Sequence, residues 1–299
     1  PKTGSGFDLS ITVALLAADG SLPPDLIAGV CHIGELGLDG SIRPVPGVLP
    51  MVMAAAAGGV CEVVVPINSA READLVPGVR VHAVRDLQDV AALYRALAAG
   101  LDPPDLMPAD VTGADSTIPD LRDVVGQAEA RLALEIAAAG QHHILLLGPP
   151  GAGKTMLAER LPGLLPPLQP HEALEVTGIH SVLGLLPPDG SLMTTPPFVG
   201  PHHGASMASV IGGGSGKVRP GAVSRAHQGV LFLDEAPEFR RDVLDGLRQP
   251  LESGEVVIAR ADRHVRLPAS FQMVMAANPC PCGHGFGKAL SCQCTPLAR

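Results

Sequence analysis

Aromatic side chains are scarce in this sequence: its 299 residues include no Trp, one Tyr and six Phe. Proteins that hold single-stranded nucleic acid by base stacking need aromatic platforms, so we do not expect stacking to be the main binding mode. Long apolar runs are missing as well, since no stretch approaches the ~18 residues of a membrane span. No signal peptide is visible either. These absences predict a cytoplasmic protein with no membrane partner.

Basic residues are outnumbered, with 21 Lys and Arg against 30 Asp and Glu and a net charge of −9. The imbalance is uneven: residues 1–140 hold 18 acidic and 8 basic residues, whereas residues 141–299 hold 12 and 13. A globally acidic chain is a poor nonspecific binder of nucleic acid. The second part still leaves room for a local basic surface.

The six cysteines fall into two groups. Cys31 and Cys61 are expected to be ordinary buried small residues. The other four follow the spacing C-x-C-x₉-C-x-C, and four thiolates suit a tetrahedral Zn²⁺ site. Reduced cysteines without metal are the alternative, because the tight C-x-C spacing departs from the usual C-x₂-C. The candidate zinc ligands are Cys280, Cys282, Cys292 and Cys294.

The chain is organised around residues 144–155, which read ILLLGPPGAGKT. The apolar run at 144–147 predicts a buried parallel strand, and the residues after it match G-x-x-x-x-G-K-[ST] ahead of a helix. Gly151 and Gly153 let backbone N–H groups curl around phosphate oxygens without a Cβ in the way. We therefore expect ATP to be bound by Gly148, Pro149, Pro150, Gly151, Ala152, Gly153, Lys154, Thr155, Met156 and Asp234.

Groups that act on the nucleotide are expected in and after this loop. Lys154 would reach the β- and γ-phosphates, and the Thr155 hydroxyl would hold Mg²⁺. Residues 229–235, GVLFLDE, form a Walker B pattern, in which a strand delivers two carboxylates at its carboxyl end. Asp234 is expected to support Mg²⁺ directly or through water, and Glu235 to activate the attacking water.

Two insertions, at 177–228 and 253–269, interrupt the second part. The second predicts a β-hairpin around Ala261-Asp262 whose basic side chains would meet phosphates, with a solvated hairpin face as the alternative. The candidate DNA contacts in the two insertions are Arg260, Arg263, Arg266, Lys217 and Arg219. In the first insertion, His202 and His203 are adjacent in a segment expected to be extended, where neighbouring side chains diverge. We favour a structural or nucleotide-sensing role for them over a pair of metal ligands.

The first hundred residues alternate short strands and helices, which predicts an α/β domain. Three segments resemble the proteolytic domain of Lon, namely 1–8, 34–48 and 65–68. The catalytic Ser-Lys dyad of that family is not matched, because its serine slot falls at Gly6 and its lysine slot at Leu49. A relocated dyad of Ser5 and Lys2 is the rival reading, although these side chains lie too close in an extended segment. Without a nucleophile and its base we do not expect a protease.

The whole chain is similar to the YifB/ComM family of magnesium-chelatase-like AAA+ ATPases. The similarity rests on the order of the Lon-like segment, GPPGAGKT, VGPHH, GVLFLDE, RQPLESGE and NPCPCG. It implies an α/β fold: a partial Lon-like domain at 1–100, a Pro- and Asp-rich linker at 101–120, and an AAA+ core at 121–299. In the core it implies a doubly wound parallel sheet with β-hairpin insertions that lie in a central pore. It also assigns to Asn278, after the strand predicted at 271–277, a part in placing the lytic water; a strand-ending turn residue is the alternative.

For function, the resemblance implies a hexameric ATP-driven motor that remodels DNA, with helicase or branch-migration activity in recombination or natural transformation. The catalytic residues would be Lys154, Glu235 and Asn278. A magnesium-chelatase-type ATPase subunit that drives metal insertion is an alternative, and an ATP-binding scaffold without turnover is another. Because the sequence begins at Pro1 and ends soon after Cys294, we expect a fragment cut at both ends. It would lack the helical lid, bind ATP and be poorly placed to hydrolyse it.

Overall fold

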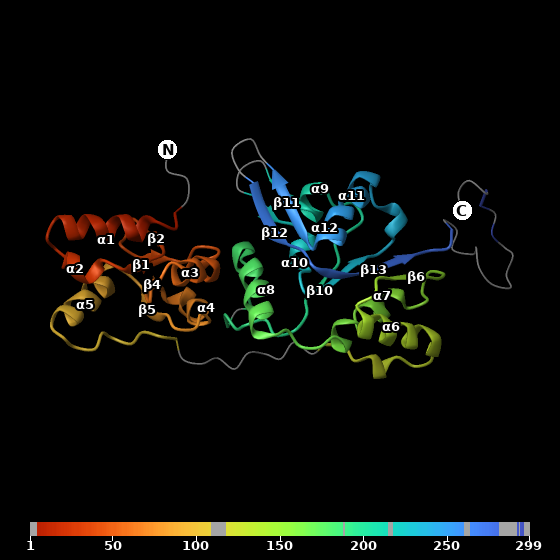
Figure 1. The fold of residues 1–299 in the computed structure, drawn as a ribbon, viewed down its shortest axis with the longest axis horizontal. Coiled ribbons are helices and arrows are strands. Elements are labelled where there is room, and N and C mark those ends of the chain that lie inside the picture. The colour runs from red at the N-terminus through yellow and green to blue at the C-terminus, as the bar shows by residue number, and fades with distance from the viewer. Residues whose placement is uncertain are drawn as a thin grey trace. The chain divides into compact units, whose positions relative to one another are not determined.

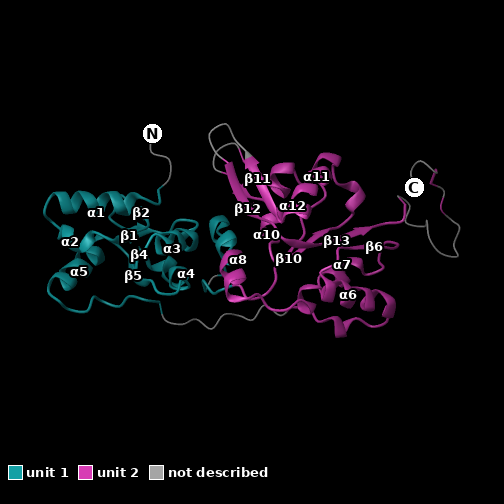
Figure 2. Ribbon diagram, viewed as in Figure 1, with its two compact units in different colours: residues 1–114, 177–192 teal, residues 115–176, 193–299 magenta. Residues whose placement is uncertain are grey.

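The computed structural model describes residues 5–108, 118–187, 189–214, 218–259, 264–280, 292 and 294–295. Contacts divide the chain into two compact units, the first formed by 1–114 with 177–192 and the second by 115–176 with 193–299 (Figure 2). The boundary at 114 falls inside the predicted linker, whereas the placement of 177–192 was not anticipated. The predicted domain limits otherwise stay a prediction, and each unit is described separately.

The first unit is built on a three-stranded parallel sheet in the order β1-β4-β5, with a small antiparallel pair, β2-β3, beside the turn at Gly40 (Figure 1). The alternation of short strands and helices predicted for the first hundred residues is present. Its elements are α1 (Asp8–Ala18), α2 (Pro24–Ile27), β1 (Val30–His32), β2 (Glu35–Leu36), β3 (Ile42–Arg43), α3 (Val48–Ala57), β4 (Glu62–Pro66), η1 (Ile67–Ser69), α4 (Ala70–Asp74), β5 (Arg80–Val84) and α5 (Leu87–Ala98).

Apolar side chains at helical spacing on α1 and α5 pack on this sheet. Leu9 and Val13 of α1 are fully buried, and they join Val64 of β4 and Leu93 of α5 in one core cluster. Each such side chain contributes about 1.5–3 kcal/mol when it leaves water. Helix α5 begins where the Asp86 side chain accepts the N–H groups of the next turn, as an N-cap should. Of the two cysteines expected to be buried, Cys31 is half-buried and Cys61 is exposed, so the expectation was wrong for Cys61.

A buried polar pair lies in this core. The His32 Nε2 and Tyr94 hydroxyl oxygen are 2.6 Å apart, and both residues are almost completely buried. Burial disfavours the charged imidazole and lowers the pKa of His32 to about 4, with a smaller contribution from nearby His82. Burial likewise raises the pKa of Tyr94. The neutral forms of both groups are therefore part of the folded state.

The positions that correspond to the Lon dyad lie near one another but carry no catalytic groups. A Cβ on Gly6 would lie 3.9 Å from the Met51 sulfur, on the same helix, α3, as Leu49. Leu49 is buried, and its N–H donates to the Glu72 carboxylate at 2.8 Å. The same carboxylate accepts the hydroxyl of Ser181, from the segment 177–192 that the unit takes from later in the chain. At the position that corresponds to the lysine of the Lon dyad, the structure therefore has a buried Leu49 whose backbone N–H binds a carboxylate.

The second unit is built on a four-stranded, fully parallel sheet in the order β6-β13-β10-β7. The strands predicted at 144–147, 229–233 and 271–277 are confirmed. Its elements are η2 (Leu121–Asp123), α6 (Ala128–Gly140), β6 (Ile144–Leu147), α7 (Lys154–Ala158), η3 (Pro162–Leu164), the first half of α8 (Pro170–Leu183), β7 (Phe198–Val199), α9 (Met207–Val210), β8 (Gly212–Gly213), β9 (Arg219–Pro220), α10 (Ala222–Arg225), β10 (Gly229–Leu233), η4 (Ala236–Glu238), α11 (Arg241–Gly246), α12 (Arg248–Ser253), β11 (Glu255–Ala259), β12 (His264–Pro268) and β13 (Phe271–Ala277).

The prediction that residues 144–147 form a buried strand was wrong in one respect. Strand β6 lies at an edge of the sheet, and Leu145 and Leu147 are about half exposed while Leu146 is buried. Every residue of the central strand β10 is buried. Central strands are covered on both faces, whereas an edge strand need not be, and strand order cannot be read from one strand's composition.

Both insertions form antiparallel pairs. Strands β11 and β12 make the predicted hairpin, and β8 pairs with β9 in the first insertion. The two pairs touch, since a Cβ on Gly212 of β8 would lie 3.2 Å from the Ile258 side chain of β11. The helix α8 was not predicted. It begins in the second unit and ends in the first.

Candidate functional site

The loop between β6 and α7 has the geometry that its glycines predict. Gly151 and Gly153 both have φ of +76°, a left-handed conformation that side-chain-bearing residues rarely adopt. At Gly153 a Cβ would also come within 3.2 Å of the Gln127 side chain. The Gln127 amide in turn donates to the Ala152 carbonyl at 3.1 Å. Gln127, a residue absent from the predicted site, therefore stabilises the conformation of the loop through its backbone.

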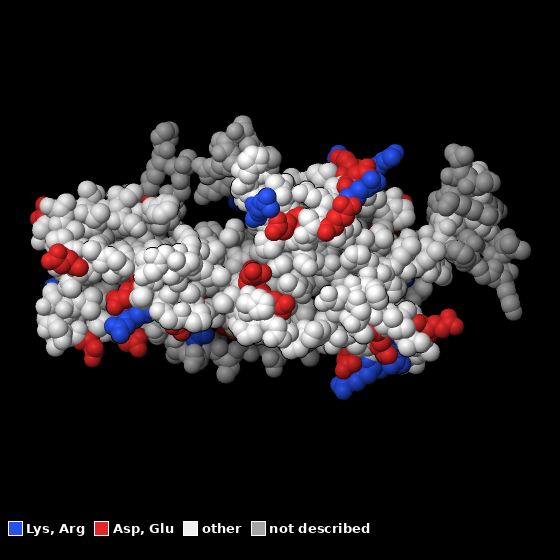
Figure 3. All heavy atoms as spheres, viewed as in Figure 1, with Lys and Arg blue, Asp and Glu red and all other residues white. Residues whose placement is uncertain are grey.

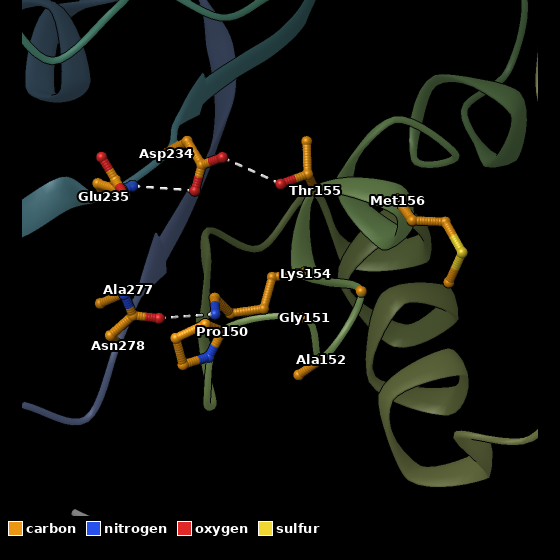
Figure 4. Close-up of a pocket in the computed structure, with 11 residues that line it drawn as sticks. Pro150, Gly151, Ala152, Lys154, Thr155, Met156, Asp234, Glu235, Ala277 and Asn278 are labelled. Carbon is orange, nitrogen blue, oxygen red and sulfur yellow. Dashed lines mark hydrogen bonds between the residues drawn. The ribbon is translucent and has the colours of Figure 1, made fainter. Parts of the chain in front are cut away.

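Lys154 is directed into the space that the loop encloses. Its Nζ donates to the carbonyls of Gly148 and Pro149 at 2.9 and 3.1 Å, and to the Asn278 Oδ1 at 3.0 Å. Asn278 follows β13, which pairs with β6 so that Ala277 lies opposite Leu147. The parallel register thus brings the amide at the end of β13 to the amine at the start of α7 (Figure 4).

Thr155 and Asp234 offer a pair of hard oxygen donors. The Thr155 hydroxyl donates to the Asp234 Oδ2 at 3.0 Å. Adjacent ligands of an octahedral Mg²⁺, with bonds of ~2.1 Å, are also about 3.0 Å apart. The donor chemistry and the spacing therefore fit Mg²⁺ at this place, which lies at the carboxyl end of β10.

Glu235 is directed away from Asp234 and remains exposed. It has φ of +51°, which is uncommon for a residue with a side chain, and its N–H donates to the Asp234 Oδ1 at 2.9 Å. Its Oε2 lies 3.6 Å from the His203 Nδ1. That nitrogen is buried and has no hydrogen bond to any described residue.

The expectation that the His202 and His203 side chains diverge was wrong. Their ring centroids are 4.1 Å apart in an edge-to-face arrangement. The segment turns instead of running extended, and the Gly204 N–H donates to the His202 Nδ1 at 3.0 Å. Because β7 pairs with β10, the turn after β7 brings His203 to the Glu235 carboxylate. The predicted site did not include His203. Its position four residues after a strand could have indicated that it lies at the same edge of the sheet as Glu235.

The loop after β6 and the side chains of Lys154, Thr155, Asp234 and Asn278 line a surface cavity of about 450 Å³. The cavity wall combines residues from the loop, from α7 and from the ends of β10 and β13 (Figure 4). Of the predicted site, only Gly148 and Pro149 are absent from the wall, and both place carbonyls on Lys154. The lining residues are Pro150, Gly151, Ala152, Gly153, Lys154, Thr155, Met156, Asp234, Glu235, Ala277 and Asn278.

The remaining predicted sites are described only in part. Arg266 on β12 and Arg219 on β9 are exposed, and Arg266 lies 3.4 Å from Glu255 across the hairpin. Cys280, Cys292 and Cys294 are brought together, with sulfur atoms within 4.8 Å of one another. Arg260, Arg263, Lys217 and Cys282 lie outside the described residues. Within those residues, no helix is long and apolar enough to cross a bilayer.

Comparison with known proteins agrees with this architecture. The family described as magnesium chelatase, subunit ChlI, matches residues 120–299, and a second ChlI family matches 1–69. The Mycobacterium tuberculosis protein Rv2897c is 53% identical over 94% of this chain and 55% of its own length. Competence protein ComM of Haemophilus influenzae is 43% identical over 96% of this chain and 56% of its own, and YifB of Escherichia coli is 42% identical over 99% and 57%. This chain spans little more than half the length of these relatives. It belongs to the magnesium chelatase ChlI family and is a YifB/ComM-type AAA+ protein.

Proposed function

We propose that the protein binds ATP with Mg²⁺ in the cavity beside residues 148–156 and hydrolyses it. The convergence of an amine and a hydroxyl from the start of α7, two carboxylates after β10 and an amide after β13 carries this proposal. Lys154 would exchange its carbonyl partners for phosphate oxygens, and Thr155 and Asp234 would hold Mg²⁺, which neutralises phosphate charge when bound. Glu235 would orient the attacking water and take its proton. Asn278 would help to place that water.

Energy from turnover is proposed to remodel DNA, by helicase or branch-migration activity in recombination or natural transformation. The support is that the hairpins β8–β9 and β11–β12 pack against each other and carry Arg219 and Arg266 exposed. On the face drawn in Figure 3, by contrast, basic and acidic side chains are interspersed and form no broad basic patch. Binding through Arg219 and Arg266 would be local to the hairpins and sensitive to salt.

Assembly into a ring, with six subunits as our proposal, would complete the site. The cavity lies at the surface and is lined by residues of a single chain, so a neighbouring subunit would cover its open side. Apolar side chains also remain exposed nearby in the chain, on β6 and on α6, where Leu132 and Ile136 are more than half exposed. Exposed apolar groups of this kind are typical of surfaces that meet another subunit.

The function is tested by ATPase rates of the protein as its gene encodes it, with and without branched DNA. We expect stimulation by DNA, no turnover in Lys154→Met, and weaker DNA binding in Arg266→Ala, measured by fluorescence anisotropy. Arg248→Ala is the matched control, because Arg248 is equally exposed and also lies beside one carboxylate, 3.1 Å from Asp245. Loss of Arg266 should reduce the slope of log affinity against log salt by about one. Equal effects of the two substitutions would contradict the proposed DNA surface.

A magnesium-chelatase-type ATPase is the second candidate, because the family that matches residues 120–299 is described by that activity. In that case turnover would respond to a partner subunit and to a porphyrin, and not to DNA. An ATP-binding scaffold would bind the nucleotide without turnover under either condition. The same rate measurements therefore separate the three possibilities.

A further inference from the structure

Three sulfur atoms meet just beyond the last strand of the second unit. Cys280 lies three residues after the end of β13 and is buried, while Cys292 and Cys294 return to it from twelve and fourteen residues later. The Cys280 and Cys292 sulfurs are 3.5 Å apart. All three sulfurs lie within 4.8 Å of one another.

These separations match a metal site better than a disulfide. A disulfide places its sulfurs about 2.05 Å apart. Thiolates on a tetrahedral Zn²⁺, with bonds of ~2.3 Å, lie about 3.8 Å from each other. The observed spacing is close to that value before any adjustment to an ion. Three thiols from separate positions therefore converge in a segment, 280–294, that contains no Asp or Glu to compete for a metal.

We propose that Cys280, Cys292 and Cys294 bind a structural Zn²⁺ ion. Thiolates are the ligands that zinc prefers in closed structural sites, and four of them complete its tetrahedron. The fourth thiol of the predicted set, Cys282, lies outside the described residues.

The site has a consequence for the ATP cavity, and this part rests on the proposed function. Only Pro279 separates Cys280 from Asn278, whose amide oxygen accepts the Lys154 amine. A metal that fixes Cys280 fixes the chain directly after Asn278 and restricts the positions that its amide can adopt. Zinc thereby acts as a positioning device for Asn278, and through it for the attacking water.

The metal is tested first without reference to activity. Zinc is measured by mass spectrometry in protein purified without chelator, and Co²⁺ is then exchanged into the site. We expect about one zinc per chain, together with the visible bands of tetrahedral cobalt and near-ultraviolet bands of thiolate charge transfer. Cys280→Ser, Cys292→Ser and Cys294→Ser should each lose the metal. Cys31→Ser and Cys61→Ser are matched controls and should keep it, because these thiols lie on or beside strands of the first unit.

Retained binding of a fluorescent ATP analogue shows that a variant is folded. The site would be overturned if the wild-type protein contained no zinc and also took up no cobalt. It would equally be overturned if Cys294→Ser and Cys61→Ser had the same metal content. For the consequence, removal of zinc should lower kcat and leave ATP affinity unchanged, with recovery when zinc is restored. An unchanged kcat in metal-free protein would overturn the positioning of Asn278. Because metal content and cobalt spectra do not depend on turnover, failure of the proposed ATPase would leave them unaffected.

Discussion

Replacement of Glu235 by Gln isolates the charge of the carboxylate that is proposed to activate water. The substitution preserves the shape of the side chain and the N–H that donates to Asp234. It also leaves the backbone at φ +51° with a residue of similar steric demand. More than half of the Glu235 side chain is exposed, so loss of its charge should not alter folding. Any change in turnover therefore reports on the chemistry.

The expected size follows from the role of a general base. Such groups contribute roughly 10²–10⁴ in rate, which is about 2.7–5.4 kcal/mol of activation free energy at 1.36 kcal/mol per tenfold. ATP affinity should be unchanged, because the proposed phosphate and Mg²⁺ contacts come from the loop, Lys154, Thr155 and Asp234. The kinetic signature is a loss of kcat without a loss of binding.

The assay compares kcat with the dissociation constant of a fluorescent ATP analogue for each variant. Glu238→Gln is the matched control: it is the same change three residues along, at an exposed position of η4. We expect it to behave as wild type. The reasoning is refuted if Glu235→Gln turns over ATP at an undiminished rate, or if its ATP binding falls in parallel with its rate.

Two further predictions concern histidines. His203→Ala should lower kcat about fivefold, an effect of about 1 kcal/mol, because His203 contacts Glu235. If His203 acts only through that contact, the same substitution should have no effect in the Glu235→Gln background. Additive losses in this double-mutant cycle would contradict a role through Glu235. The first unit should lose stability in acid, because the pKa of His32 falls from 6.5 to about 4 on folding. The stabilisation that neutral His32 provides is complete above pH 6.5 and is lost as the pH falls toward 4, a loss of roughly 2–3 kcal/mol. Tyr94 is the sole Tyr and there is no Trp, so tyrosine fluorescence during urea titration reports the unfolding of this unit. His32→Gln should flatten the pH dependence of its free energy of unfolding. An equally steep dependence in that variant would contradict the assignment to His32.

The sequence predicted best those parts of the fold that are local. The loop at 148–155 and the strands β10 and β13 follow from a phosphate-binding motif and from short apolar runs, and the structure has them at the expected residues. What it could not predict depends on contacts between distant segments. The exposure of Leu145 follows from β6 lying at a sheet edge, and the meeting of His203 with Glu235 follows from the pairing of β7 with β10.

Helix α8 was missed for a different reason. Pro170 at its start is a recognised beginning for a helix, but Gly178 lies in its interior, where glycine costs about 1 kcal/mol relative to alanine. Its buried side chains are mixed, since the small polar Thr177 and Ser181 are buried beside apolar Val176 and Ile179, which blurs the apolar stripe of a helix. The helix is stabilised by tertiary contacts that no local pattern records.

The placement of residues 177–192 with the first unit means that the two units are interlaced in sequence. A single cut between residues 108 and 118 would break the chain without releasing either unit, because the segment that completes the first unit remains covalently part of the second. A fragment that stops at residue 108 would leave the Glu72 carboxylate without the Ser181 hydroxyl that it accepts. A stretch of chain that contains the whole first unit therefore also contains residues 148–156, which are proposed to bind ATP.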